Sequence, residues 1–232
     1  MSPSCYIVCG SKPWNRAVFD RQIRTLPGNW HFFGKREELA PEAVAALRPK
    51  ALFFLHWSWK VPREITEKYQ CINFHMTDVP FGRGGSPLQN LILRSHRSTR
   101  LSALRMTDAM DAGPVYLKED LSLRGPAREI LERSSALAAA MIARIVREQP
   151  SPIPQEGTVV TFERRTPAQS VIPSGLTLPQ LYDFIRMLDC EGYPPAFLEH
   201  GGYRYEFTNA AGGKGSLEAR VRIRPAKEDR KG

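Results

Sequence analysis

The first two-thirds of the chain alternate short apolar runs with stretches that have the spacing of amphipathic helices. Runs that are apolar at nearly every position predict strands buried on both faces, and they cover residues 5–9, 30–33, 51–57 and 71–75. Helical spacing covers residues 16–26, 41–47 and 62–69, which lie between those runs. This alternation predicts a Rossmann-like α/β fold, with a mostly parallel sheet and helices on both faces.

The pattern continues with another helix, a strand and an extended segment before a long helix begins. These elements are predicted at residues 87–96, 101–106, 114–123 and 127–148. The proline-containing stretch QPSPIP, residues 149–154, then breaks the pattern. The break predicts that a first unit ends at residue 150.

Residues 151–232 read as a small α+β extension. A helix is predicted at 178–188 and two strands at 203–208 and 217–223. An extension of this size buries too little apolar surface to fold well alone, so we expect it to dock on the unit formed by residues 1–150. The final AKEDRKG is expected to be a disordered tail.

The composition is that of an ordinary globular protein. Of 232 residues, 42% are hydrophobic and 25% charged. No apolar run approaches the roughly 20 residues that span a bilayer, and the N-terminus lacks the pattern of a signal peptide, so we expect a cytoplasmic protein without a membrane partner. The four cysteines include no CxxC pair. We interpret them as core thiols and predict no metal site.

The net charge of +9 leaves several anionic partners open. Residues 218–232 carry six Lys or Arg against three acids, and the remaining excess is scattered along the chain. A diffuse positive surface suits a nucleotide, a folate polyglutamate or tRNA. Charge alone does not choose among them.

Candidate chemistry begins in the run that ends at residue 75. Asn73 and His75 are two positions apart, so in a strand they project from the same face, about 6.6 to 7 Å apart. A loop follows at once, which places the pair at the carboxyl end of a strand, where ligands bind in open α/β sheets. A hydrogen-bonded pair within the core is the alternative interpretation.

Two further segments add chemistry after that strand. The loop TDVPFGRGGS, residues 77–86, allows close backbone approach to a ligand, and Arg83 within it can contact an anion. Asp111 lies in the turn MDAGP, where it is either a functional carboxylate or an ordinary turn residue.

Taken together, these segments resemble the folate-dependent formyltransferase superfamily. The resemblance rests on Asn-x-His, then Pro and Arg-Gly within about ten residues, then Asp-x-Gly-Pro. It implies that Asn73, His75 and Asp111 are the catalytic residues. The sequence departs from the family's pattern after His75, where Met76 replaces the usual proline, and the Leu-Pro expected before Arg-Gly is also missing.

The resemblance also implies the reaction. The formyl donor would be N10-formyltetrahydrofolate, and the acceptor an amine. Asn73 can donate to the oxygen that becomes negative, and His75 can either stabilise that charge or take the amine's proton. Asp111 can orient the imidazole. The reduced folate is expected between residues 57–62 and 106–111, with Trp57, Trp59, Met106 and Asp111 as its contacts.

The end of the first predicted strand supplies candidate substrate contacts. A βα turn at this position binds phosphates in doubly wound sheets, although the GxGxxG fingerprint of dinucleotide sites is absent. Asn15 can alternatively be a helix cap. The predicted substrate contacts are Ser11, Lys12, Trp14, Asn15 and Arg83.

The resemblance is strongest to the nucleotide-sugar N-formyltransferases, because the pattern YDFIR…YPPAF, with Tyr182, Asp183 and Tyr193, is similar to theirs. The small extension and the first βα turn favour the same choice. We therefore expect formylation of an amino sugar linked to UDP, dTDP or GDP, with no nucleic-acid partner and a homodimer left open. A methionyl-tRNA formyltransferase-like enzyme and a non-catalytic nucleotide- or folate-binding protein are the alternatives.

Overall fold

A computed structural model describes residues 3–212 and 215–226 of the chain. Its main sheet has six strands in the order β2-β1-β3-β4-β6-β7. The three pairs that join β2, β1, β3 and β4 are parallel, whereas β6 runs antiparallel to both of its neighbours. The strands are β1 (Cys5–Gly10), β2 (Asn29–Phe33), β3 (Ala51–Leu55), β4 (Gln70–His75), β6 (Ser98–Arg105) and β7 (Val115–Ser122).

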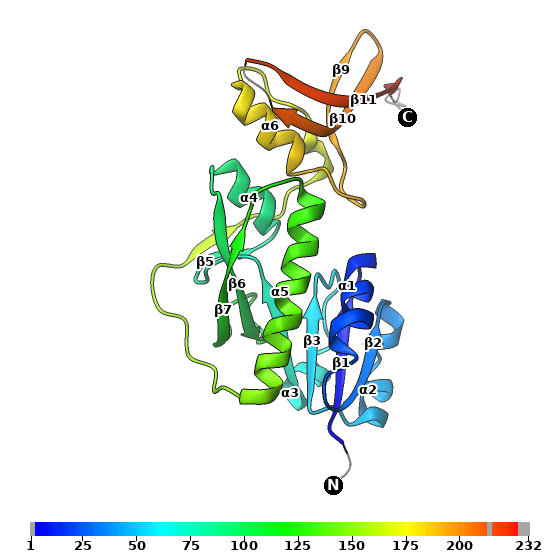
Figure 1. Cartoon of the computed structure of the whole chain (residues 1–232), viewed down its shortest axis with the longest axis vertical. Coiled ribbons are helices and arrows are strands. Elements are labelled where there is room, and N and C mark those ends of the chain that lie inside the picture. The colour runs from blue at the N-terminus through cyan, green and yellow to red at the C-terminus, as the bar shows by residue number, and fades with distance from the viewer. Residues whose placement is uncertain (1–2, 213–214, 227–232) are drawn as a thin grey trace.

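Helices cover both faces of this sheet, so the predicted Rossmann-like fold is confirmed (Figure 1). One face packs on the α1–η1 segment and on the long helix α5, which crosses it lengthwise. The other face packs on η2, α2 and α3. The helical segments are α1 (Pro13–Val18), η1 (Phe19–Ile23), η2 (Arg36–Leu39), α2 (Pro41–Leu47), α3 (Arg63–Lys68), α4 (Pro87–Leu93) and α5 (Ala127–Glu148).

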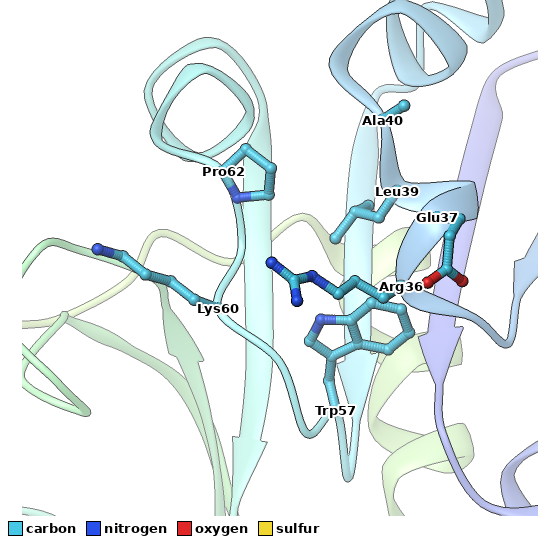
Figure 2. Close-up of a pocket in the computed structure, with 7 residues that line it drawn as sticks. All are labelled: Arg36, Glu37, Leu39, Ala40, Trp57, Lys60 and Pro62. Carbon is cyan, nitrogen blue, oxygen red and sulfur yellow. The ribbon is translucent and has the colours of Figure 1, made fainter.

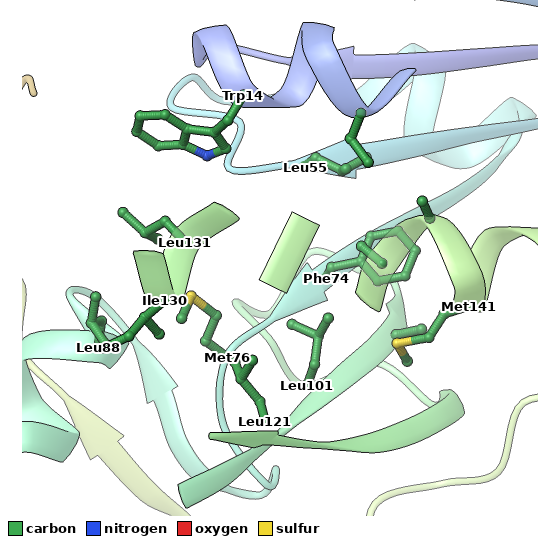
Figure 3. Packing of buried hydrophobic residues seen from close by; sticks show 14 of the residues in the cluster. Trp14, Leu55, Phe74, Met76, Leu88, Leu101, Leu121, Ile130, Leu131 and Met141 are labelled. Atoms are coloured by element: carbon green, nitrogen blue, oxygen red, sulfur yellow. The ribbon is translucent and has the colours of Figure 1, made fainter. Parts of the chain in front are cut away.

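Strand alternation divides the core into two layers and decides which face carries the candidate residues. Phe74 and its neighbours Leu55 and Leu101 pack beneath α5, together with Met141 of that helix (Figure 3). Cys71 belongs to the opposite layer. Because alternate residues of a strand share a face, Asn73 and His75 lie on the same side of β4 as Cys71.

The chain returns along the first unit after α5 and then builds a second, smaller sheet (Figure 1). Short strands β5 (Phe81–Gly84) and β8 (Val160–Phe162) pair in parallel. Past η3 (Pro167–Ser170) come α6 (Leu178–Arg186) and an antiparallel sheet of order β11-β10-β9. Its strands are β9 (Ala196–His200), β10 (Tyr203–Gly212) and β11 (Leu217–Pro225). The boundary at residue 150 stays a prediction, and the expected tail falls mostly on residues 227–232, outside the described part of the chain.

A buried arginine joins α6 to the first unit. Arg186 is 2% exposed, and its Nη1 donates to the carbonyl oxygens of Leu123 and Gly125 at 2.7 and 2.8 Å. Its Nε donates to Asp183 at 2.6 Å. A buried guanidinium is strongly destabilising when its N–H donors lack acceptors. The hydrogen bonds of Arg186 to Leu123 and Gly125 therefore fix where α6 docks.

Local differences from the predicted elements have simple causes. The strand expected to reach residue 57 ends at Leu55, because His56 adopts a left-handed backbone conformation with φ of 46°. The helix expected at 16–26 begins earlier, with Pro13 in its first turn, and continues as a π-helical segment. The β5–β8 pair was not predicted, because it joins segments almost eighty residues apart.

Three of the four cysteines, Cys9, Cys71 and Cys190, are buried, as expected of core thiols, and burial raises the pKa of the Cys71 thiol to about 12. Within residues 3–212 and 215–226, no cluster of three or more His, Cys, Asp or Glu side chains has the arrangement of a metal site. Across the same residues, no helix is long and apolar enough to cross a membrane.

Candidate active site

The structure brings the three predicted catalytic residues together at the carboxyl end of the main sheet. Asn73 Nδ2 donates to Asp111 Oδ1 at 3.1 Å, and His75 Nδ1 lies 3.5 Å from Asp111 Oδ2. The side chains of His75 and Asp111 are 8% and 10% exposed. Residues almost forty positions apart in sequence thus form one compact, mostly enclosed polar cluster.

Both ring nitrogens of His75 face oxygen atoms. Nε2 lies 2.8 Å from the carbonyl oxygen of Gly82, while Nδ1 faces the Asp111 carboxylate. A neutral imidazole has one donor nitrogen and one acceptor nitrogen, whereas a protonated one donates from both. The contacts of both nitrogens fix the orientation of the His75 ring within the cluster.

The glycine-rich loop contributes backbone groups to the same cluster. Gly82 has φ of 77° and accepts from both His75 and Thr77, and the N–H of Gly84 donates to Asp111 Oδ2 at 3.0 Å. A Cβ on Gly84 would lie 2.4 Å from the carbonyl oxygen of Phe162. The close approach of β5 to β8 therefore requires glycine at this position.

The turn that carries Asp111 is held in an unusual conformation. Asp111 has φ of 51°, in the left-handed region that few residues other than glycine adopt. A Cβ on Gly113 would meet the carbonyl oxygen of Arg105 at 1.8 Å, so the turn lies tightly against the end of β6. Met106, a predicted folate contact, packs against the core layer on the same face as Asn73.

The two tryptophans predicted to contact folate lie together after β3. Trp57 and Trp59 are in edge-to-face contact, with ring centroids 4.8 Å apart, and Trp59 is 37% exposed. The indole nitrogen of Trp57 is buried and has no hydrogen-bond partner in the described part of the chain. A buried donor without an acceptor is costly, and it is a feature that a bound ligand can satisfy.

A pocket of about 340 Å³ opens beside Trp57 (Figure 2). Figure 2 shows the Arg36 side chain between Pro62 and the Trp57 ring, with Lys60 directed away from them. Neither Arg36 nor Lys60 forms an ion pair with the described residues. The far wall comes from residues 36–40, and not from residues 106–111, which were expected to face the loop.

The predicted substrate loop is occupied by a hydrogen-bond network around a histidine that the sequence interpretation did not single out. His56 Nδ1 lies 3.2 Å from Trp14 Nε1 and 3.1 Å from Asn15 Nδ2, and its Nε2 lies 3.0 Å from Ser134 Oγ. Ser11 Oγ donates to the backbone oxygen of His56 at 2.6 Å. Burial and, secondarily, the Lys12 ammonium lower the pKa of His56 to about 4, so the ring is neutral at physiological pH.

Within that loop the side chains differ in what they can still contact. Asn15 is fully buried and its Oδ1 accepts from the N–H of Lys12, which supports the capping alternative. Lys12 is half-buried and forms no ion pair with the described residues. Arg83, the remaining predicted substrate contact, donates to Gln155. The assignment of Ser11, Lys12, Trp14, Asn15 and Arg83 to substrate binding stays a prediction.

Known proteins that resemble the chain in sequence and structure show which family it belongs to. A family model described as the C-terminal domain of methionyl-tRNA formyltransferase matches residues 167–224. A solved structure of methionyl-tRNA formyltransferase from Clostridium thermocellum is 40% identical, with a TM-score of 0.91, over 96% of this chain and 100% of that chain. The chain belongs to the methionyl-tRNA formyltransferase family. It spans about half the length or less of the curated relatives it matches, such as the methionyl-tRNA formyltransferase of Gluconobacter oxydans, at 29% identity over 56% of this chain and 44% of the relative.

Membership of this family corrects the predicted substrate. The sugar N-formyltransferase interpretation is wrong, and so is the expectation of a nucleotide-linked amino sugar as partner with no nucleic acid. A 4-N formyltransferase from Francisella tularensis is only 12% identical, over 85% of this chain and 93% of its own, and its TM-score of 0.69 shows a shared fold alone. The YDFIR…YPPAF pattern had been assigned to the sugar enzymes, but it lies inside the segment that matches the methionyl-tRNA formyltransferase C-terminal domain. The small size of the extension had been taken as evidence against that domain.

Proposed function

We propose that this protein transfers a formyl group from N10-formyltetrahydrofolate to the amino group of methionyl-tRNA. One observation carries the proposal: the Asn73–His75–Asp111 cluster occurs in a chain 40% identical, over the full length of the solved relative, to a methionyl-tRNA formyltransferase. The relative's name specifies the acceptor, and the cluster supplies groups of the kind that formyl transfer needs. The expected cytoplasmic location stays a prediction.

Asn73 is positioned to stabilise developing negative charge. Attack of an amine on a formyl carbon forms a carbon–nitrogen bond and places negative charge on the formyl oxygen. The Asn73 amide has two N–H donors and uses one of them on Asp111. The second can be directed at that oxygen, as a side-chain donor of an oxyanion hole is.

His75 and Asp111 have two different tasks, which are stabilisation of the negative oxygen and acceptance of the amine's proton. The acceptor amine loses one proton during the reaction, and the departing donor nitrogen gains one. His75, whose ring nitrogens face Asp111 and the Gly82 carbonyl oxygen, lies beside the Asn73–Asp111 pair and can stabilise the same negative oxygen. Asp111 holds the imidazole and is the carboxylate within reach to take the amine's proton, directly or through water. Of the two roles left open for His75, the geometry favours charge stabilisation.

The residues near Trp57 fit a reduced folate. When bound, the folate supplies the formyl group. The exposed face of Trp59 can stack on a flat ring, and the unpartnered indole N–H of Trp57 can donate to a polar edge or a carboxylate. Arg36 and Lys60 line the adjoining pocket and suit the glutamate carboxylates. The loop that carries Trp57 follows β3, which pairs with β4 through Phe54 and Asn73, so a folate held by this loop would be bound at the same end of the sheet as Asn73.

The small sheet offers a surface for the RNA part of the acceptor. Strand alternation puts Arg220, Arg222 and Arg224 on one face of β11, with Arg204 opposite Arg224 on β10. Glu206 pairs with Arg224, whereas Arg220 and Arg222 form no ion pair with the described residues. A row of exposed arginines on a strand is suited to successive phosphates.

One assay tests the proposal. Purified protein is incubated with N10-formyltetrahydrofolate and methionyl-tRNA, and formylmethionine is measured by mass after the aminoacyl ester is hydrolysed. We expect turnover that falls steeply with salt, and charge reversal of Arg220 and Arg222 should reduce the salt slope by about two. The charge-matched control is Lys68→Glu with Arg147→Glu, because these residues lie in the last turns of α3 and α5 and outside the small sheet. Absence of formylation of methionyl-tRNA, with the fold intact and reduced folate bound, would reject the proposed acceptor.

A further inference from the structure

Gln155 lies in the segment that follows α5, and its amide bridges two loops of the candidate active site. Oε1 accepts from Arg83 Nε at 3.0 Å and from Arg83 Nη2 at 2.8 Å. Nε2 donates to the carbonyl oxygens of Asp111 and Gly113, both at 2.8 Å. Both ends of the side chain are therefore hydrogen-bonded, one end to the glycine-rich loop and the other to the Asp111 turn.

The residues that Gln155 holds are next to the cluster in both loops. Arg83 is flanked by Gly82, whose carbonyl oxygen contacts His75, and by Gly84, whose N–H contacts Asp111. On the other side, the bond to the Asp111 carbonyl fixes the backbone from which that carboxylate projects. A shift of either loop would therefore change the contacts of His75 or Asp111.

The Asp111 turn needs outside support. A non-glycine residue with φ of 51° is in a strained conformation that persists only where surrounding contacts hold it. The turn offers two carbonyl oxygens, those of Asp111 and Gly113, and the Gln155 side chain pairs with both. Its donors thus stabilise the conformation that aims Asp111 at Asn73 and His75.

The backbone around Gln155 is fixed on both sides, so its side chain is presented in a defined place. Ile153 exchanges two backbone hydrogen bonds with Val115, at 2.7 and 2.9 Å. Further on, β8 pairs with β5. Gln155 is half-buried between Pro154 and Glu156, which are both exposed.

We propose that Gln155 is a positioning residue for formyl transfer, which acts by locking the Asp111 turn and the glycine-rich loop to each other. It acts through Asp111 and through the loop at Arg83, and it does not itself contact the reacting atoms. The kinetic consequence rests on the proposed function, whereas the structural consequence can be measured without it.

The structural arm uses hydrogen–deuterium exchange. Gln155→Met keeps the length of the side chain and removes all four hydrogen bonds. We expect faster exchange in peptides that cover residues 82–86 and 109–114, because the Gly84 N–H is protected by its bond to Asp111. Gln149→Met is the matched control, since that glutamine accepts from Lys50 at an exposed position after the same helix. Wild-type exchange at both loops of Gln155→Met would overturn the proposal whether or not the protein formylates anything.

The kinetic arm is a double-mutant cycle. Gln155→Met should lower kcat about 10- to 100-fold while the KM for each substrate changes less than about threefold. In an Asp111→Ala background the same substitution should have little further effect, since its route of action is already lost. A full, multiplicative loss in that background would contradict positioning through Asp111. Should Gln155→Met fail to fold, Gln155→Glu keeps the acceptor for Arg83 and removes the donors to the turn, and a kcat like that of wild type would then reject the proposal.

Discussion

Two histidines lie at neighbouring strand ends of the same sheet and differ in almost every respect. His56 follows β3 and His75 ends β4, and the two strands pair with Phe54 opposite Asn73. The His56 ring faces neutral groups: two N–H donors at Nδ1 and a serine hydroxyl at Nε2. The His75 ring faces a carboxylate and a carbonyl oxygen.

This difference separates a structural histidine from a catalytic candidate. The surroundings of His56 satisfy a neutral ring completely, and burial lowers its pKa to about 4. The His75 ring instead lies between a glycine-rich loop and a turn in which Asp111 has φ of 51°, and both contribute oxygen atoms to it. Both rings have polar partners on both nitrogens, and what distinguishes them is the kind of atom that each nitrogen meets.

The largest expected effect is on turnover at the His75 cluster. Asp111→Ala removes the partner of both Asn73 and His75, and kcat should fall about 10²- to 10³-fold, as after loss of an oxyanion-hole donor. The melting temperature should also fall, because the Asn73 amide and the Gly84 N–H lose their acceptor. Steady-state formylation kinetics with calorimetry measures both quantities. A variant with near-wild-type kcat would remove Asp111 from the mechanism.

The converse is expected at His56. His56→Ala removes the acceptor of the Trp14 N–H and one of the two partners of both the Asn15 amide and the Ser134 hydroxyl, at a cost of about 2–4 kcal/mol of unfolding free energy. The kcat of the folded fraction should stay within about threefold of wild type. Denaturant unfolding and kinetics on the same sample test this. A variant with wild-type stability and no activity would contradict the structural role assigned to His56.

The pH dependence of stability should distinguish the two sites next. The pKa of His56 is about 4 when folded and about 6.5 when unfolded, so between these values the unfolded state binds more protons. Stability from this group is therefore present above pH 6.5 and is lost as pH falls toward 4, by at most about 3 kcal/mol.

His56→Asn tests that loss, because asparagine tolerates the left-handed backbone and offers an acceptor oxygen but does not titrate in this range. Its melting temperature should fall less steeply than that of wild type between pH 6.5 and 4. His200→Asn, at an exposed histidine, should keep the wild-type slope. Parallel slopes for wild type and His56→Asn would show that His56 is not the titrating group.

The smallest effect is expected in the pocket beside Trp57. Arg36→Ala and Lys60→Ala should each raise the KM for the folate donor by a few-fold, roughly 1 kcal/mol or less, and leave kcat unchanged, since each removes an exposed contact that is equal in ground and transition states. A donor with several glutamates should be affected more than one with a single glutamate. Equal sensitivity of the two donors would exclude these cations from carboxylate binding.

The rule of strand alternation explains why the sequence predicted the His75 cluster and also why it missed the His56 network. Alternation within a strand assigns faces correctly while the backbone stays extended, which holds for Asn73 and His75. The run ALFFLHW looks like an uninterrupted strand, but His56 adopts a left-handed conformation that no local residue type announces. Gln155 was missed because its partners are 42 to 72 positions away, and a glutamine in a proline-rich break carries no local signal.

The substrate prediction failed at a different level. A pattern of apolar and aromatic residues such as YDFIR…YPPAF predicts a helix that docks, which the structure contains as α6, whereas β9 was not predicted. Such a pattern encodes packing, and packing is shared by relatives that act on unlike molecules. The relatives that correct the substrate were identified by similarity over the whole chain, and not by this pattern.

The return of the chain along the first unit has a consequence for how such proteins can be recombined. Ile153 pairs with β7, and β8 pairs with β5. The stretch from Ile153 to β8 is therefore fixed at both ends and contacts the loops that hold the catalytic candidates. A chimera joined at the proline-rich break would import Gln155 and β8 from a foreign parent and match them to loops that they did not evolve with. A junction after Phe162 keeps those contacts native, and the contacts that must then be compatible are those of the docked α6 region, including Arg186 with Leu123 and Gly125 and Gln89 with Met187. The better junction for a chimera of this protein therefore lies after Phe162, and not directly after α5.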